Sequence, residues 1–179
     1  MQECEQGHGV SVFQHGVDVA YRYADLARYI AGAKCNLQWP RLEQALPMLQ
    51  ALAEHAMQPA DVSRYQIYHD CGKPFCRTVD EEGRVHFPDH ANISAAVWQS
   101  LYPTDTIGYT LIKYDLHPHT AKGVELDEFC ALELAPTLML TAWAALYANA
   151  ELLFGGFESD SFKMKFKRLL RLSKRILNR

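Results

Sequence analysis

The chain has 179 residues, of which 49% are hydrophobic and 22% are charged, and its formal net charge is −3. This balance suits one globular domain with its own core and excludes a chain that is disordered throughout. No apolar run approaches the about 20 residues that span a bilayer, and the N-terminus lacks a signal-peptide pattern, so we expect a cytoplasmic protein.

The five cysteines are odd in number and scattered along the chain. This argues against a disulfide framework and fits a reducing compartment. Cys71 and Cys76 have no second close pair, so a structural zinc knuckle is a weaker interpretation than two small, partly buried side chains. We expect free thiols.

The first third of the chain predicts two helices. Apolar residues recur at three- and four-residue steps in residues 10–31, which predicts a helix that carries His15 and ends at Gly32. The same spacing over residues 42–53 predicts a second helix, which Pro47 would kink.

A third helical segment is predicted over residues 62–69, with Asp61 as its cap. Gly72 breaks its continuation. The adjacent His69 and Asp70 are therefore expected near a helix end.

The middle of the chain interrupts the helical pattern once. Residues 75–87 have two extended flanks around an acidic turn with Gly83, which predicts a small β-hairpin. Helical composition returns in residues 89–101, and a short apolar stretch over residues 106–114 precedes a His-Pro-His loop.

The C-terminal third predicts a buried helix and a basic one. Residues 127–150 are apolar on nearly all sides, and Pro136 either bends this helix or separates two. Residues 162–177 alternate apolar and basic residues. We therefore expect an all-α helical bundle with a minor hairpin, divided into a domain of residues 1–157 and a basic helix in residues 158–179 that packs on it or extends it.

Histidine and aspartate residues on separate segments form the candidate chemical centre, namely His15, His69, Asp70, His90 and Asp115. Neutral imidazole and carboxylate suit divalent ions such as Mn, Fe, Co, Ni, Zn or Mg. One element cannot surround an ion, so distant partners are required.

A lone histidine is weak support for a metal site, and His8, His55 and His86 are interpreted as surface or hydrogen-bonded residues. The Gly-Lys-Pro that follows the His-Asp pair adds a close backbone approach and a cation, Lys73, where a phosphate would lie. Arg77 is more simply a solvated arginine.

The stretch from His69 to Ala95, His-Asp-Cys-Gly-Lys-Pro through a hairpin to Phe-Pro-Asp-His-Ala-Asn-Ile-Ser-Ala, resembles the HD superfamily of metal-dependent phosphohydrolases. It is most similar to the HD domain that accompanies bacterial CCA-adding tRNA nucleotidyltransferases. His15, in Gln-His-Gly-Val-Asp, adds the upstream element of that pattern.

The resemblance implies a divalent metal bound by four residues, namely His15, His69, Asp70 and Asp115. It also implies that this ion activates a water for in-line attack on a phosphate ester, with Asp70 orienting the water. Lys73 and His90 would neutralise charge on the phosphate oxygens, as in other phosphoryl transfers. Arg77 and His119 would contact the substrate, and His117 could join them.

For the fourth ligand of the resemblance, the sequence offers several positions. Asp115 is the best candidate, whereas the helix that ends near Ala150 offers no Asp. Asn149 and Glu151 are poorer options there.

The charge is strongly segregated. Eight of the 18 basic residues and none of the 21 acidic ones follow Ser161, so the tail carries +8 and the rest of the chain −11. Packing on the body is the first interpretation of the basic tail, contact with RNA or DNA the second, and a membrane surface the third.

Two hypotheses of different classes follow. The first is a phosphatase or phosphodiesterase that acts on a nucleotide or a phosphorylated nucleic-acid end. The second is a non-catalytic HD module that binds nucleotide or RNA. The full His-Asp-Gly-Lys set favours the first.

Overall fold

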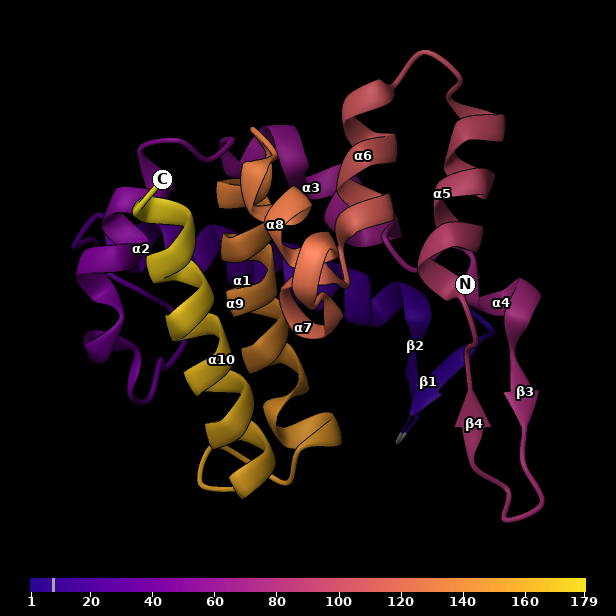
Figure 1. Cartoon of the computed structure of the whole chain (residues 1–179). Helices are drawn as coiled ribbons and strands as arrows, with labels where there is room; N and C mark the ends of the chain where they lie inside the picture. The colour runs from indigo at the N-terminus through magenta and orange to yellow at the C-terminus, as the bar shows by residue number, and fades with distance from the viewer. Residues whose placement is uncertain (8) are drawn as a thin grey trace.

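A computed structural model describes residues 1–7 and 9–179, and it is mostly helical (Figure 1). The helices are α1 (Val12–Ile30), α2 (Leu46–Ala53), α3 (Pro59–Tyr68), α4 (Lys73–Cys76), α5 (His90–Leu101), α6 (Thr106–Tyr114), α7 (His117–Thr120), α8 (Gly123–Ala131), α9 (Ala135–Leu153) and α10 (Asp160–Leu177), with a 3-10 turn at Leu42–Gln44. The strands are β1 (Glu5–Gly7), β2 (Val10–Ser11), β3 (Thr78–Val79) and β4 (Val85–His86).

This architecture confirms the expected mostly-α fold with a small β-hairpin. The hairpin pairs β3 with β4 in antiparallel register, with Thr78 opposite His86, and it projects from the helical body (Figure 1). A second small sheet, of β1 and β2, precedes α1 and was not predicted.

The core forms where α1 packs against α3 and α9, and α2 also contacts α9. Its largest fully buried side chains include Trp143 and Tyr147 of α9, Tyr23 and Leu26 of α1, and Phe162 of α10. Helix α9 is therefore covered on most sides, as its almost continuous apolar sequence predicted.

Helix α1 begins and ends close to its predicted bounds. The side chain of Ser11 accepts a hydrogen bond from the backbone N–H of Gln14 and so caps the helix. His15 consequently lies in the first turns of a well-defined helix.

Two expectations about local boundaries were wrong. Pro47 lies in the first turn of α2 rather than kinking it, because first-turn residues need no N–H partner within the helix. Asp61 also lies inside a first turn, since α3 begins at Pro59 after Gln58.

Two other prolines, Pro136 and Pro118, also lie in the first turns of helices. Pro136 lies in the first turn of α9, so the apolar run divides into α8 and α9, whose axes differ by 110°. The expected His-Pro-His loop is a single helical turn, α7, with Pro118 in its first turn.

The basic helix α10 packs on the body. Ser159 caps its first turn, and its apolar side contacts α9 and α2 (Figure 1). The buried residues of this side are Phe162, Phe166, Leu169 and Leu172.

Among the described residues, no single helix is both long and apolar enough to cross a membrane. Only α8 and α9 taken together, across their bend, reach that length and composition. All five cysteine thiols are free, as expected.

Candidate metal centre

The first potential ligand, His15, is held next to α3 by its neighbour Gly16. A β-carbon on Gly16 would collide with the backbone carbonyl of Ile67, so only glycine allows α1 and α3 to approach this closely. The rings of His15 and His69 are consequently 5.5 Å apart between centroids.

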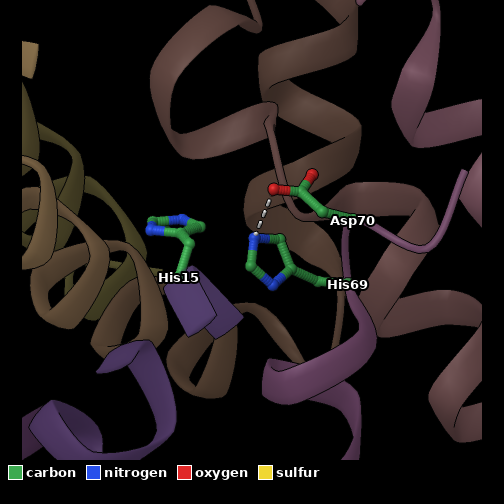
Figure 2. Close-up of side chains that lie close together, drawn as sticks. All are labelled: His15, His69 and Asp70. Atoms are coloured by element: carbon green, nitrogen blue, oxygen red, sulfur yellow. Dashed lines mark ion pairs between the residues drawn. The ribbon is translucent and has the colours of Figure 1, made fainter. Parts of the chain in front are cut away.

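His69 and Asp70 follow directly on α3, where His69 is the C-terminal cap residue. One potential ligand atom from each of His15, His69 and Asp70 lies within 4.8 Å of the other two, and all three residues are buried. Figure 2 shows these side chains gathered together, with the ion pair between His69 and Asp70 dashed.

The His69 ring is oriented from both sides. Its Nδ1–H donates to the backbone carbonyl of Gln66 at 2.6 Å, and its Nε2 lies 3.1 Å from Oδ2 of Asp70. A carbonyl bond to one ring nitrogen is the usual means of directing the other nitrogen towards a metal.

Lys73 belongs to the same cluster. Its Nζ donates to Oδ2 of Asp70 at 2.6 Å and to Oε1 of Gln6 at 2.9 Å. It also lies 5.2 Å from the ring centroid of Phe87, and the residue is only 8% exposed. Lys73 thus positions Asp70 as well as supplying a charge.

His90, the first residue of α5, approaches the other carboxylate oxygen of Asp70. Its Nδ1–H donates to the carbonyl of Phe87 at 2.9 Å, and its Nε2 lies 3.5 Å from Oδ1 of Asp70. Asp70 is therefore faced by three cationic or potentially cationic side chains.

A second close backbone approach brings α5 to the centre. The N–H of Gly72 donates to Oγ of Ser94 at 2.8 Å, and a β-carbon on Gly72 would collide with the backbone of Ser94. The glycine of Gly-Lys-Pro therefore serves helix packing beside the His-Asp pair.

The buried charges shift the proton affinities of the cluster. Burial and the nearby His69 lower the pKa of His15 to about 3, which keeps this imidazole neutral. Burial alone would lower the pKa of His69, but Asp70 and Asp115 raise it to about 9. Burial alone would raise the pKa of Asp70, but His69 and Lys73 hold it well below its usual range.

Asp115 lies close enough for its charge to act on His69, yet the three-residue ligand group does not include it. It follows the end of α6, and the hydroxyl of Tyr65 donates to its Oδ1. Burial, together with Asp115, raises the pKa of Tyr65 well above its usual range. The Asp115 carboxylate is thus held by Tyr65, a residue of α3 that lies one helical turn before His69.

Asn149 and Glu151 were the alternatives to Asp115 as the fourth ligand. Oδ1 of Asn149 is buried and has no hydrogen-bond partner among the described residues. The side chain of Glu151 lies outside the described part of the chain.

The other expected substrate contacts lie at the end of α4 and on α7. Arg77 is exposed at the end of α4. His119 lies near Lys165 and Arg168 of α10, whose charges act on it, because α7 packs against that helix. The ring of His117 lies 4.6 Å from that of Tyr114 and 6.0 Å from that of Phe129, between centroids.

The histidines interpreted as ordinary surface residues are exposed where they are described. This holds for His55 and for His86, whose ring pairs with Asp80 in the hairpin. His8 lies outside the described residues.

Four supporting residues were not predicted, namely Gln6, Tyr65, Gln66 and Ser94. Gln66 could have been found, because a residue three positions before a helix-end histidine offers it a carbonyl. No local pattern signals Gln6, which is 67 positions from the lysine that it binds.

The residues present fit a divalent metal ion. Two imidazoles and one carboxylate suit borderline divalent ions, and three protein ligands leave positions for water or a substrate oxygen. His15 is already neutral, and because Nδ1 of His69 donates to the Gln66 carbonyl, its Nε2 would bind an ion on losing the proton that it shares with Asp70.

Comparison of the chain with protein-family models, curated proteins and solved structures finds no match. A proposal about function therefore depends on the residues of the chain itself.

Proposed function

We propose that the chain is a divalent-metal-dependent phosphohydrolase, a phosphatase or phosphodiesterase that acts on a phosphate ester of a nucleotide or nucleic-acid end. The observation that carries this proposal is the buried group of His15, His69 and Asp70, whose ligand atoms lie within 4.8 Å of one another. Lys73 and His90 lie beside this group and would supply positive charge of the kind that stabilises phosphoryl transfer.

A bound divalent ion would polarise a phosphoryl oxygen and lower the pKa of a water nucleophile. Asp70 has its orientation fixed by Lys73 and His69 and would both hold the ion and orient the water. Lys73 and His90 would offset the negative charge that collects on phosphate oxygens. For Lys73 this requires the substrate to compete with Gln6 for its ammonium group.

One observation favours a second candidate, a non-catalytic HD module that binds nucleotide or RNA. Lys73 is already paired with Asp70 and Gln6, and Asp115 is bonded to Tyr65. A cluster whose charges are neutralised by one another can stabilise the fold without catalysing a reaction.

The test is hydrolysis by protein that has been stripped with EDTA and reloaded with Mn, Fe, Co, Ni, Zn or Mg. The substrates are p-nitrophenyl phosphate, bis-p-nitrophenyl phosphate and 2',3'-cAMP. We expect at least one ion to support hydrolysis and Asp70→Asn to reduce it to the metal-free rate.

His15→Ala should behave like Asp70→Asn, whereas His55→Ala removes an exposed imidazole by the same substitution and should retain wild-type activity. Absence of hydrolysis with every ion, or equal rates in wild type and Asp70→Asn, would leave the non-catalytic candidate.

A further inference from the structure

The outer side of α10 carries three exposed cations, Lys167, Arg171 and Lys174. With Met164 and Leu170 they line a shallow groove along the helix, which we call the basic face. Met164 is 64% exposed, so the apolar floor of this groove is open as well.

Most other cations of α10 and the C-terminus are already engaged by the body. Lys163 lies 3.3 Å from Glu158, and Arg175 pairs with Asp127. Arg168 donates to the carbonyls of Pro118 and Ala121 at 2.8 Å each. The contacts of Arg168 and Arg175 hold the helix to the body and leave the basic face to a different role.

The three cations of the basic face form no ion pair with any residue that the structure describes. The one acidic residue of α10 is its first, Asp160, and no acidic residue follows Ser161, so no carboxylate of the helix lies one turn from any of the three cations. Such an uncompensated row costs free energy through repulsion unless an external anion neutralises it.

We propose that the basic face binds the phosphodiester backbone of a single nucleic-acid strand. At about 1.5 Å of rise per residue, the cations span about 10 Å along the helix. That length is enough to contact more than one phosphate of the same strand. Met164 and Leu170 would lie against sugars or unstacked bases.

A membrane surface fits this helix less well. Interfacial helices bury an apolar side in the lipid, but the apolar side of α10, including Phe162, Phe166 and Leu169, is already buried in the protein. An acidic partner protein would need a larger apolar surface than Met164 and Leu170 provide. The net charge of −11 on the rest of the chain would also confine a polyanion to the basic face.

The test is fluorescence anisotropy of fluorescein-labelled U12 and dT12 with the full chain, in EDTA, over 25 to about 200 mM salt. The test variant is Lys167→Gln/Arg171→Gln/Lys174→Gln. The control, Arg28→Gln/Lys34→Gln/Lys122→Gln, removes the same charge from exposed positions elsewhere.

We expect both oligonucleotides to bind wild type and the control, because the backbone is shared by RNA and DNA. The test variant should bind at least about 10-fold more weakly at 50 mM salt, with a log-log salt slope smaller by about 2. Unfolding midpoints in urea would show that it folds.

Three results would overturn the proposal: no binding at 25 mM salt, equal weakening in the test and control variants, or an unchanged salt slope in the test variant. If the first of these results came with retention on vesicles of phosphatidylcholine and phosphatidylserine, the basic face would bind lipid instead. Because EDTA removes the metal, failure of the hydrolytic function would not alter any of these results.

Discussion

Gly16 of α1 packs directly against the backbone of Ile67 in α3, and this contact sets the position of the candidate metal centre. Each of the two residues neighbours part of the centre: Gly16 follows His15, and Ile67 precedes His69 by two positions. A side chain at position 16 would have to push the helices apart and would separate the two imidazoles.

Gly16→Ala should therefore destabilise the protein. Replacing an unhindered glycine within a helix by alanine stabilises a protein by about 1 kcal/mol. Overpacking of the contact with Ile67 should instead destabilise it by about 1–3 kcal/mol. Urea unfolding shows whether Gly16→Ala raises or lowers the free energy of unfolding. The metal content after dialysis should fall together with that stability. A higher unfolding midpoint in Gly16→Ala would show that the helices do not depend on this contact.

Lys73→Met tests the charge balance around Asp70. Removing one partner of a buried ion pair costs about 3–5 kcal/mol, because the other charge stays buried, so the variant should unfold at a clearly lower urea concentration in EDTA. Since a bound ion also supplies positive charge, a saturating divalent metal should raise the melting temperature more in Lys73→Met than in wild type.

The exposed Lys122→Met serves as the control for Lys73→Met and should melt as wild type does in both conditions. Equal metal-induced shifts in Lys73→Met and wild type would mean that Lys73 and the ion do not compensate the same carboxylate.

Asp115→Asn tests whether Asp115 is itself a metal ligand or influences the ligands through the residues next to it. Tyr65 holds Asp115, and among the residues that the structure describes the ligand group consists of His15, His69 and Asp70. We therefore expect Asp115→Asn to keep the metal stoichiometry and lose affinity by about 10-fold. Asp70→Asn should lose the metal. Metal titration followed by elemental analysis distinguishes them, and equal loss in both variants would make Asp115 the fourth ligand.

The helices could be predicted from the sequence because their apolar spacing is a local property. The helix expected over residues 10–31 matches α1, and the hairpin expected over residues 75–87 contains β3 and β4. Proline positions were harder: Pro47 was expected to kink a helix although it lies in a first turn, and for Pro136 the sequence left open whether it bends one helix or separates two.

The candidate site could be predicted as a set of residues but not as a network. The motif places His69, Asp70 and Lys73 in one segment, so their proximity follows from the chain itself. The hydrogen bonds from Lys73 to Gln6 and from Tyr65 to Asp115 join residues 67 and 50 positions apart. Such contacts depend on how the helices pack, and no periodicity in either segment signals them.

His119 should make stability depend on pH. Burial, followed by the charges of Lys165 and Arg168, lowers its pKa from 6.5 to about 4 in the folded protein. The unfolded chain therefore binds more protons between these values, so the stability supplied by neutral His119 is present above pH 6.5 and is lost as the pH falls towards 4.

His119→Gln should remove this dependence. Between pH 7 and pH 5, wild type should lose up to about 2 kcal/mol more of its unfolding free energy than the variant does. Urea titrations at both values measure the difference, and His55→Gln, at an exposed position, should follow wild type. If His119→Gln and wild type lose stability in parallel, the histidine is protonated without cost and α7 does not bury it in solution.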